Sequence, residues 1–372
     1  MKQSERKKSY GLLIFSIILL IGSIAWTIYY RDYLSVSKQL SNVKAQKGVL
    51  ENVIETIDSV QEGQTTVEEG VTKVEKSAEN DKLSEELQAM ILSVKEEVFT
   101  DESEALAKKE ELSEQLKAVE ASTAELSEEK LRLERPYSYG LTGVFMAILF
   151  LLRGLYNALK GSPVSSKKNT AIMVQAGFLA ALCYIGFAFC KIDIPVGTEK
   201  TAFHLGNTFC ALAALLLGGY WGGLAGAVGM TIGDLTTAYV TSAPKTFLLK
   251  LCIGLIVGFV AHKLFKLSRS HDAKYVTGVT ILSCICGLGF NVIADPLVGY
   301  FYKTYLLGVP QDASKLLAKI SAMTTFVNAV IAVIAASIIY LALRPALKKS
   351  GLFVQVTPEA LEEKKDENDQ SK

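Results

Sequence analysis

The sequence predicts an all-α membrane protein with eight membrane-spanning helices, and three observations support this prediction. Half of the residues are hydrophobic, and the mean hydropathy is positive, at +0.28. The apolar residues gather into stretches that suit a bilayer core of about 30 Å, which takes about 20 residues of helix to cross. Lysine and arginine concentrate in short links, whereas most acidic residues fall in residues 31–135. The net charge of +1 therefore hides a strong segregation and gives no indication of nucleic-acid binding.

The first apolar stretch covers residues 10–30 and follows four basic residues. Trp26, Tyr29 and Tyr30 close it, as is typical of a membrane interface. A cleaved signal peptide is the alternative, because Ser23-Ile24-Ala25 resembles a small-x-small cleavage site. The stretch is longer than a typical signal core, so we predict an N-terminal transmembrane anchor over residues 1–30.

Residues 31–136 are expected to form a helical hairpin outside the membrane. Their apolar residues recur at steps of three and four, the spacing of a coiled-coil seam. One seam comprises Val36, Leu40, Val43, Leu50, Ile54 and Ile57, another comprises Leu112, Leu116, Val119, Leu126 and Leu133, and shorter matches lie between them. Asp101 followed by Glu104 resembles the capping box that opens a helix. Two outer helices of roughly 50 Å each would form a spacer or oligomerisation stalk, with a ligand sensor or a docking site as the alternative.

The rest of the chain is predicted to hold a second anchor and a compact helical block. The anchor covers residues 137–160, and a Gly-, Pro- and Ser-containing linker at 161–170 is expected to be flexible. Six further spans are predicted at about 171–190, 205–220, 222–241, 245–264, 274–301 and 317–343. Most links between them are too short for separate domains, so residues 171–345 are expected to form one bundle. The acidic segment 346–372 is expected to be a disordered tail.

The distribution of basic residues predicts the orientation in the membrane. Basic links occur at the N-terminus and at residues 160–168, 263–274 and 344–349. The positive-inside rule assigns these links to the cytoplasm of a bacterial cell. Both termini then lie in the cytoplasm. The hairpin and the connections at 191–204 and 302–316 lie outside.

Motifs for common enzymatic chemistry are missing from the sequence. It contains no GxxxxGK[ST], HExxH or GxSxG pattern, only three histidines, and no CxxC pair among its six cysteines. We therefore expect no enzymatic activity, no cofactor and no metal site. The glycine repeats between Gly218 and Gly229 lack a preceding soluble strand, so they indicate close helix packing rather than dinucleotide binding.

Eight polar or charged residues lie within the six-span block, where lipid would tolerate them poorly. They are His204, Asn207, Asp234, Lys245, Lys250, Asn291, Asp295 and Asn328. Hydrogen bonding between helices is the simpler explanation, at under about 2 kcal/mol for each bond. In the predicted topology, however, most of them lie in the outer half of the bundle, and charges of both signs recur at similar depth. We therefore predict a substrate-binding pocket that opens outward.

Four segments of this block form a combined pattern in a fixed order. They are His204-Leu205-Gly206-Asn207, the run Leu215–Gly229, Gly233-Asp234 and the segment Pro244–Gly258. Over about residues 170–345 the pattern resembles the S component of energy-coupling factor (ECF) vitamin transporters. The resemblance implies a six-helix subunit that binds a vitamin or its precursor from outside. A membrane scaffold protein and two cytosolic ATPases would then drive release as the subunit topples in the bilayer. The pattern is most similar to the riboflavin-type branch, while pyrimidine vitamins, pantothenate and pyridoxine stay open.

The resemblance also implies an interface with the scaffold protein. The family's first helix carries an Ala-x-x-x-Ala pattern, which Ala176 and Ala180 match, and Gly177 and Ala181 would extend the strip of small residues. Packing inside the bundle is the alternative for this strip.

The first 160 residues have no counterpart in the resemblance, which leaves a competing function open. The chain could be a membrane-anchored sensor or structural protein that uses the outer hairpin. Its short cytoplasmic segments argue against a signalling output. A channel would need rings of like residues, which the sequence does not show.

Overall fold

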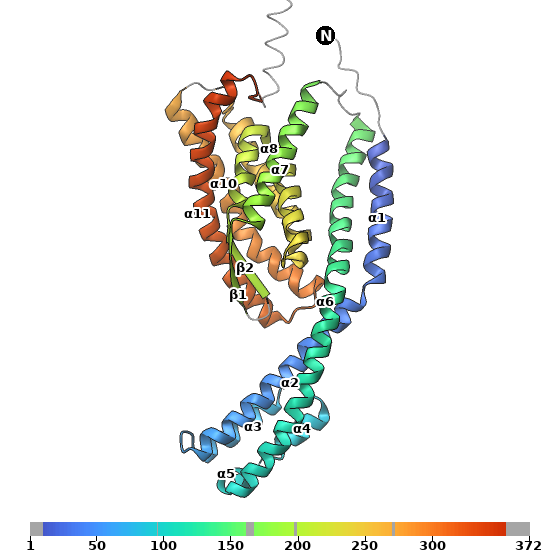
Figure 1. Cartoon of the computed structure of the whole chain (residues 1–372), viewed down its shortest axis with the longest axis vertical. Coiled ribbons are helices and arrows are strands. Elements are labelled where there is room, and N and C mark those ends of the chain that lie inside the picture. Colours follow the sequence, from blue (N-terminus) through green and yellow to red (C-terminus); the bar gives the residue numbers. More distant parts are fainter. Residues whose placement is uncertain (1–9, 95, 161–166, 197–198, 270–271, 355–372) are drawn as a thin grey trace, which may run out of the picture. The chain divides into compact units, whose positions relative to one another are not determined.

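The computed structural model describes residues 10–94, 96–160, 167–196, 199–269 and 272–354. Within them the chain is almost wholly helical, and seven helices are long and apolar enough to cross a membrane (Figure 1). This confirms the predicted all-α membrane class. Residues 161–166 of the predicted flexible linker and residues 355–372 of the predicted tail lie outside the described residues. Contacts divide the chain into unit 1 (residues 1–30, 135–306 and 311–372) and unit 2 (residues 31–134 and 307–310).

Unit 2 is built on two long antiparallel helices, α2 (Asp32–Gln61) and the first part of α6 (Glu102–Lys160). Lys47 of α2 pairs with Glu120 of α6 at 2.7 Å, and Asp58, further along α2, pairs with Lys109, which comes earlier on α6. The Asp101 carboxylate accepts hydrogen bonds from the backbone N–H groups of residues 103 and 104, so it caps α6 at the position that the sequence predicts.

Three shorter helices cover this pair. They are α3 (Val67–Ala78), α4 (Glu85–Leu92) and α5 (Glu96–Thr100). Leu50, Ile57, Ile91 and Leu112 have no exposed surface and belong to one apolar cluster of α2, α3, α4, α5 and α6 residues. The predicted seams therefore contribute to a core that the shorter helices share.

The anchor pair in unit 1 consists of α1 (Gly11–Tyr29) and the second part of α6. Glycines of α6 allow the two helices to approach closely, because a Cβ on Gly154 would lie 2.8 Å from the Leu13 Cα. α6 runs without interruption through Pro136, where the sequence analysis places the boundary between the hairpin and the second anchor. Proline removes one helical N–H and disturbs the preceding turn. The Trp26 indole of α1 donates a hydrogen bond to the Pro136 carbonyl at 2.8 Å, which adds a tie between the anchors at this point.

The bundle in unit 1 follows the predicted spans closely. It comprises α7 (Lys167–Ala188), α8 (Gly206–Thr236), α9 (Ala243–Gly258) with η2 (Phe259–Leu264), α10 (Ala273–Phe301) with η3 (Tyr302–Leu306), and α11 (Gln311–Lys349). The two predicted spans at 205–220 and 222–241 are the two arms of α8. The chain reverses between them at Gly218, where φ is 80° and ψ is 173°. The reversal brings Gly226 against Cys210, since a Cβ on Gly226 would lie 2.8 Å from the Cys210 sulfur.

The connection between α7 and α8 forms a β-hairpin that the sequence analysis did not predict. β1 (Lys191–Val196) pairs antiparallel with β2 (Glu199–His204). His204 therefore ends a strand and precedes α8. Figure 1 shows the hairpin at one end of the bundle, with the first turn of α7 and the last turn of α11 at the opposite end.

Candidate functional site

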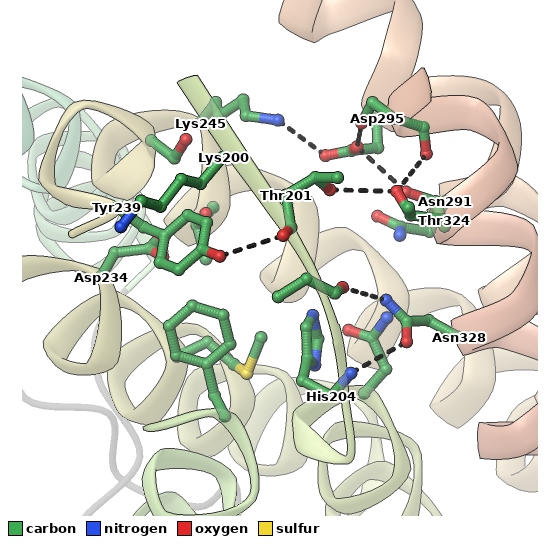
Figure 2. Close-up of a pocket in the computed structure, with 18 of the residues that line it drawn as sticks. Lys200, Thr201, His204, Asp234, Tyr239, Lys245, Asn291, Asp295, Thr324 and Asn328 are labelled. Carbon is green, nitrogen blue, oxygen red and sulfur yellow. Dashed lines mark hydrogen bonds and ion pairs between the residues drawn. The ribbon is translucent and has the colours of Figure 1, made fainter. Parts of the chain in front are cut away.

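A cavity of about 800 Å³, which includes the open space at its mouth, lies within the bundle. Its walls come from α7, β2, α8, the connection from α8 to α9, α9, α10, η3 and α11 (Figure 2). All eight residues predicted for a substrate pocket line it: His204, Asn207, Asp234, Lys245, Lys250, Asn291, Asp295 and Asn328. The structure thus brings these residues together around one space. That they bind a ligand stays a prediction.

Asp295 of α10 ties three helices together. One carboxylate oxygen lies 2.9 Å from the ammonium nitrogen of Lys245 on α9, and both side chains are mostly buried. The other oxygen accepts hydrogen bonds from Ser321 at 2.5 Å and Thr325 at 3.1 Å, both on α11. The charges of Lys245 and Asp295 therefore match each other, and both side chains have partners within the protein.

Asn328 of α11 holds the β-hairpin in place. Its amide nitrogen donates to the Ala202 carbonyl, and its amide oxygen accepts from the His204 backbone N–H, each at 3.0 Å (Figure 2). One turn earlier, the Thr324 hydroxyl lies 3.0 Å from the Thr201 hydroxyl. Because the Asn328 amide is used to position β2, its part in the site is structural support of the wall.

A second group of contacts fixes the hairpin to the connection between α8 and α9. The Tyr239 hydroxyl lies 2.7 Å from an Asp193 carboxylate oxygen and 3.1 Å from the Thr201 carbonyl, with its proton available to either. The Lys191 ammonium lies 3.1 Å from the same carboxylate oxygen. Partial burial alone would raise the pKa of Asp193, but the Tyr239 hydrogen bond and the nearby Lys191 lower it overall. An ionised Asp193 therefore strengthens this attachment.

Four lining residues have buried side-chain atoms without a hydrogen-bond partner among the described residues. Asn207, Asp234 and Asn291 are at most 2% exposed. Among the described residues, no hydrogen-bond partner exists for the Oδ1 atoms of the two asparagines or for Oδ2 of Asp234, and the same holds for Nδ1 of His204. Buried polar atoms are rarely left in this state unless water or a ligand satisfies them. These atoms are suited to contact a bound molecule.

Several lining residues escaped the sequence analysis. They are Lys200, Thr201, Tyr239, Lys303, Ser321, Thr324 and Thr325, together with the apolar residues Phe187, Met230, Leu317 and Ile320. A signal was present on α11, where residues 321, 324, 325 and 328 recur at helical spacing on one face. The residues of β2 could not be placed, because the strand itself was not predicted.

The strip of small residues on α7 divides between two faces. Ala176 is 8% exposed and belongs to the bundle core, and the Ala180 carbonyl faces Gly229 so closely that a Cβ on the glycine would overlap it. Gly177 and Ala181 are exposed, and a Cβ on Gly177 would meet nothing within 4 Å. The Ala-x-x-x-Ala pair therefore packs against α8, and only the extension of the strip is open to another protein.

Together these features define a membrane-embedded binding protein, with a polar cavity enclosed by a helical bundle and a β-hairpin over one end. No cluster of histidine, cysteine or acidic residues suited to a metal ion occurs in the described part of the chain. Residues 167–345 match the family model "ECF-type riboflavin transporter, S component". This part of the chain belongs to that family, which confirms the resemblance. The protein is accordingly a multi-pass membrane protein and a substrate-binding subunit of a transport system. No curated protein and no solved structure matches the chain.

Proposed function

We propose that the protein captures riboflavin, or a closely related vitamin or precursor, at the outer side of a bacterial cell membrane and delivers it inward. The observation that carries this proposal is the row of unpartnered buried atoms on Asn207, Asp234 and Asn291. These atoms line a cavity inside the segment that matches the riboflavin transporter family. They offer acceptors to the N–H and O–H groups of a polar heterocycle.

The cavity has the general properties of a small-molecule site. Pockets for such ligands usually combine apolar walls with a few well-placed polar groups. Phe187, Met230 and Leu317 supply apolar surface, and Tyr239 adds an aromatic ring. A flat aromatic vitamin would gain burial from the first group and orientation from the unpartnered amides.

The proposed orientation places the β-hairpin end of the bundle outside and both termini in the cytoplasm. The positive-inside rule supports it, because Lys348 and Lys349 end α11 at the end of the bundle opposite the hairpin. The cavity residues of β2 and of the Tyr239 connection would then face the side from which the vitamin arrives.

Delivery would depend on a membrane scaffold protein and two cytosolic ATPases, as the family implies. We place the scaffold contact on the exposed face of α7, around Gly177 and Ala181. Met173, Val174 and Phe178 on this face are 56%, 67% and 65% exposed, so the small residues lie within apolar surface. Such a strip allows another helix to approach closely.

Unit 2 is proposed to be a separately folded helical domain outside the membrane. Its apolar cluster, which includes Leu50, Ile57 and Leu112, supports this. The same cluster favours the competing function of a membrane-anchored sensor or structural protein. The two functions differ in one property, because only the transport function requires the bundle to bind a vitamin.

Ligand binding by the purified full-length protein tests the proposal. Riboflavin fluorescence should be quenched on addition of the protein, and Asn291→Leu should weaken binding by about tenfold or more because it removes an amide that the ligand would satisfy. Asn52→Leu, on the exposed surface of α2, is the matched control and should bind as the unmodified protein does. Absence of binding to riboflavin and to the other open vitamins, in a folded preparation, would rule out the proposed function.

A further inference from the structure

We propose that this cavity selects its ligand by the hydroxyl groups of a polyhydroxylated chain, and that Asn207 and Asp234 of α8 receive this chain. The preferred ligand is then a vitamin or precursor that joins an aromatic ring to a chain with several hydroxyls. The inference rests on the proposed function, because it names the ligand class and the recognised part of the ligand for the same site. Among the vitamins that stay open, riboflavin has both parts, whereas pyridoxine lacks the chain and pantothenate lacks the ring.

The first argument concerns four charged residues of the cavity wall, which match one another. Lys245 forms an ion pair with Asp295 at 2.9 Å, as Figure 2 shows. Lys250 interacts electrostatically with both Asp295 and Asp234. A further charge brought in by a ligand would disturb this balance, and a buried charge without a counter-charge is strongly unfavourable. Neutral hydrogen-bonding groups are therefore better suited to these residues.

The second argument is the chemistry of the unpartnered atoms on the wall. Oδ1 of Asn207, Oδ1 of Asn291 and Oδ2 of Asp234 are buried and have no hydrogen-bond partner within the described part of the chain. An amide oxygen or an ionised carboxylate oxygen can only accept, so each of the three requires an N–H or O–H donor on the ligand. Nδ1 of His204 can accept or donate, depending on its tautomer. A ligand with a single donor would leave at least two buried oxygens unsatisfied, which is unfavourable.

The third argument is the placement of these oxygens. A Cβ on Gly206 would overlap the Met230 sulfur, so the first turn of α8 lies directly against its second arm. Asn207 follows Gly206, and Asp234 lies one turn after Met230, so both oxygens belong to this side of the cavity. Asn291 comes from α10, and Figure 2 shows it on the opposite side of the view from Asp234. Neighbouring hydroxyls of a chain fit the two acceptors on α8, while an N–H of the ring fits Asn291.

A series of flavins with the same ring tests this inference on the unmodified protein. The purified full-length protein in lipid nanodiscs is titrated with riboflavin, with lumiflavin, which has a methyl group in place of the chain, and with araboflavin, whose chain differs only in the direction of one hydroxyl. Quenching of flavin fluorescence measures all three. Lumiflavin should bind at least about a hundredfold more weakly than riboflavin, because it leaves the acceptors on α8 without donors. Araboflavin should bind at least about fivefold more weakly, because one hydroxyl no longer points to its acceptor.

Variants test the assignment of the chain to α8. Asn207→Leu removes one acceptor at similar size, so it should lower the affinity for riboflavin by about tenfold and the affinity for lumiflavin by less than about twofold. Asp234→Asn exchanges an ionised acceptor for a neutral one and should reduce the preference for riboflavin over lumiflavin by about threefold. Damage to the fold would weaken both ligands alike. Asn52→Leu, on the exposed surface of α2, is the matched control and should leave both affinities unchanged.

The outcomes separate this inference from the proposed function. If lumiflavin or araboflavin binds as tightly as riboflavin, the hydroxyl chain is not recognised, so the inference is wrong and the proposed function stands. If pyridoxine or pantothenate binds and no flavin does, the inference is again wrong, while the capture of a vitamin stands. If none of these vitamins binds, both are wrong. Equal losses for riboflavin and lumiflavin in Asn207→Leu would overturn the assignment of the chain to α8.

Discussion

Replacing Asp295 with asparagine is expected to destabilise the bundle strongly, and the contacts of this side chain give the magnitude. The change removes the charge opposite Lys245, whose side chain is only 11% exposed, but keeps an oxygen that can accept from Ser321 or Thr325. Removing one partner of a buried ion pair costs about 3–5 kcal/mol, because the other charge stays buried. With the retained hydrogen bonds, we expect a loss of about 2–4 kcal/mol in the free energy of unfolding.

A double-mutant cycle isolates the ion pair. Lys245→Met alone should also destabilise the protein, because it leaves the Asp295 carboxylate without its cation. The combination of Lys245→Met with Asp295→Asn removes both charges, so it should be more stable than the sum of the single losses by about 1–3 kcal/mol. Denaturant-induced unfolding in detergent micelles, followed by tryptophan fluorescence, measures each variant. A coupling near zero would refute the reasoning, since it would mean that the pair contributes no more than two separate contacts.

Three further predictions follow from single positions. Gly218→Ala should cost about 1–3 kcal/mol of stability, because only glycine readily adopts the φ of 80° and ψ of 173° at the reversal of α8. Thermal unfolding measures this loss of stability. Gly278→Ala, at an open helical position, should cost far less. The attachment through Asp193 should persist above the ordinary carboxyl pKa of 3.8 and be lost as the pH falls through the lower folded-state pKa. Asp193→Asn should remove this acid dependence, measured as protease sensitivity of the hairpin against pH, and an unchanged profile would contradict the attachment. Gly177→Trp should block assembly with the scaffold while ligand binding persists, since a side chain at this position meets nothing within the bundle. Gly278→Trp is the matched control. Normal co-purification of the partners with Gly177→Trp would exclude this face as the scaffold contact.

The positions of the spans and of the cavity residues could be predicted because the bilayer limits where polar groups can lie. A charged or amide side chain within an apolar span is stable only where it faces a partner or a cavity. Lys250 and Asn291 lie far apart in sequence, yet under this constraint both side chains line the same cavity. The prediction of a shared pocket therefore depended on this energetic cost and on the predicted topology, with no knowledge of how the helices pack.

The elements that the sequence analysis missed depend on tertiary partners. β1 alternates polar and apolar residues, as in Lys191-Ile192-Asp193-Ile194, which is a signal for a strand. Six residues with a proline among them are nevertheless a weak signal, and the hairpin is held by contacts from distant residues such as Asn328 and Tyr239.

The sequence gives no reason to distinguish among the eight predicted cavity residues, but hydrogen bonding in the structure separates five of them into two groups. Asp295, Lys245 and Asn328 have partners within the protein, so changing them should lower stability first and ligand binding as a consequence. Asn207 and Asn291 bear buried oxygens without partners among the described residues, so these oxygens destabilise the ligand-free protein, and a bound molecule can satisfy them. Asn291→Leu should therefore leave the thermal stability of the ligand-free protein unchanged or raise it, while it weakens binding. A ligand-binding residue is expected to show this opposition between stability and affinity. If Asn291 served only to join helices, its replacement would lower the stability of the protein and its affinity for the ligand together.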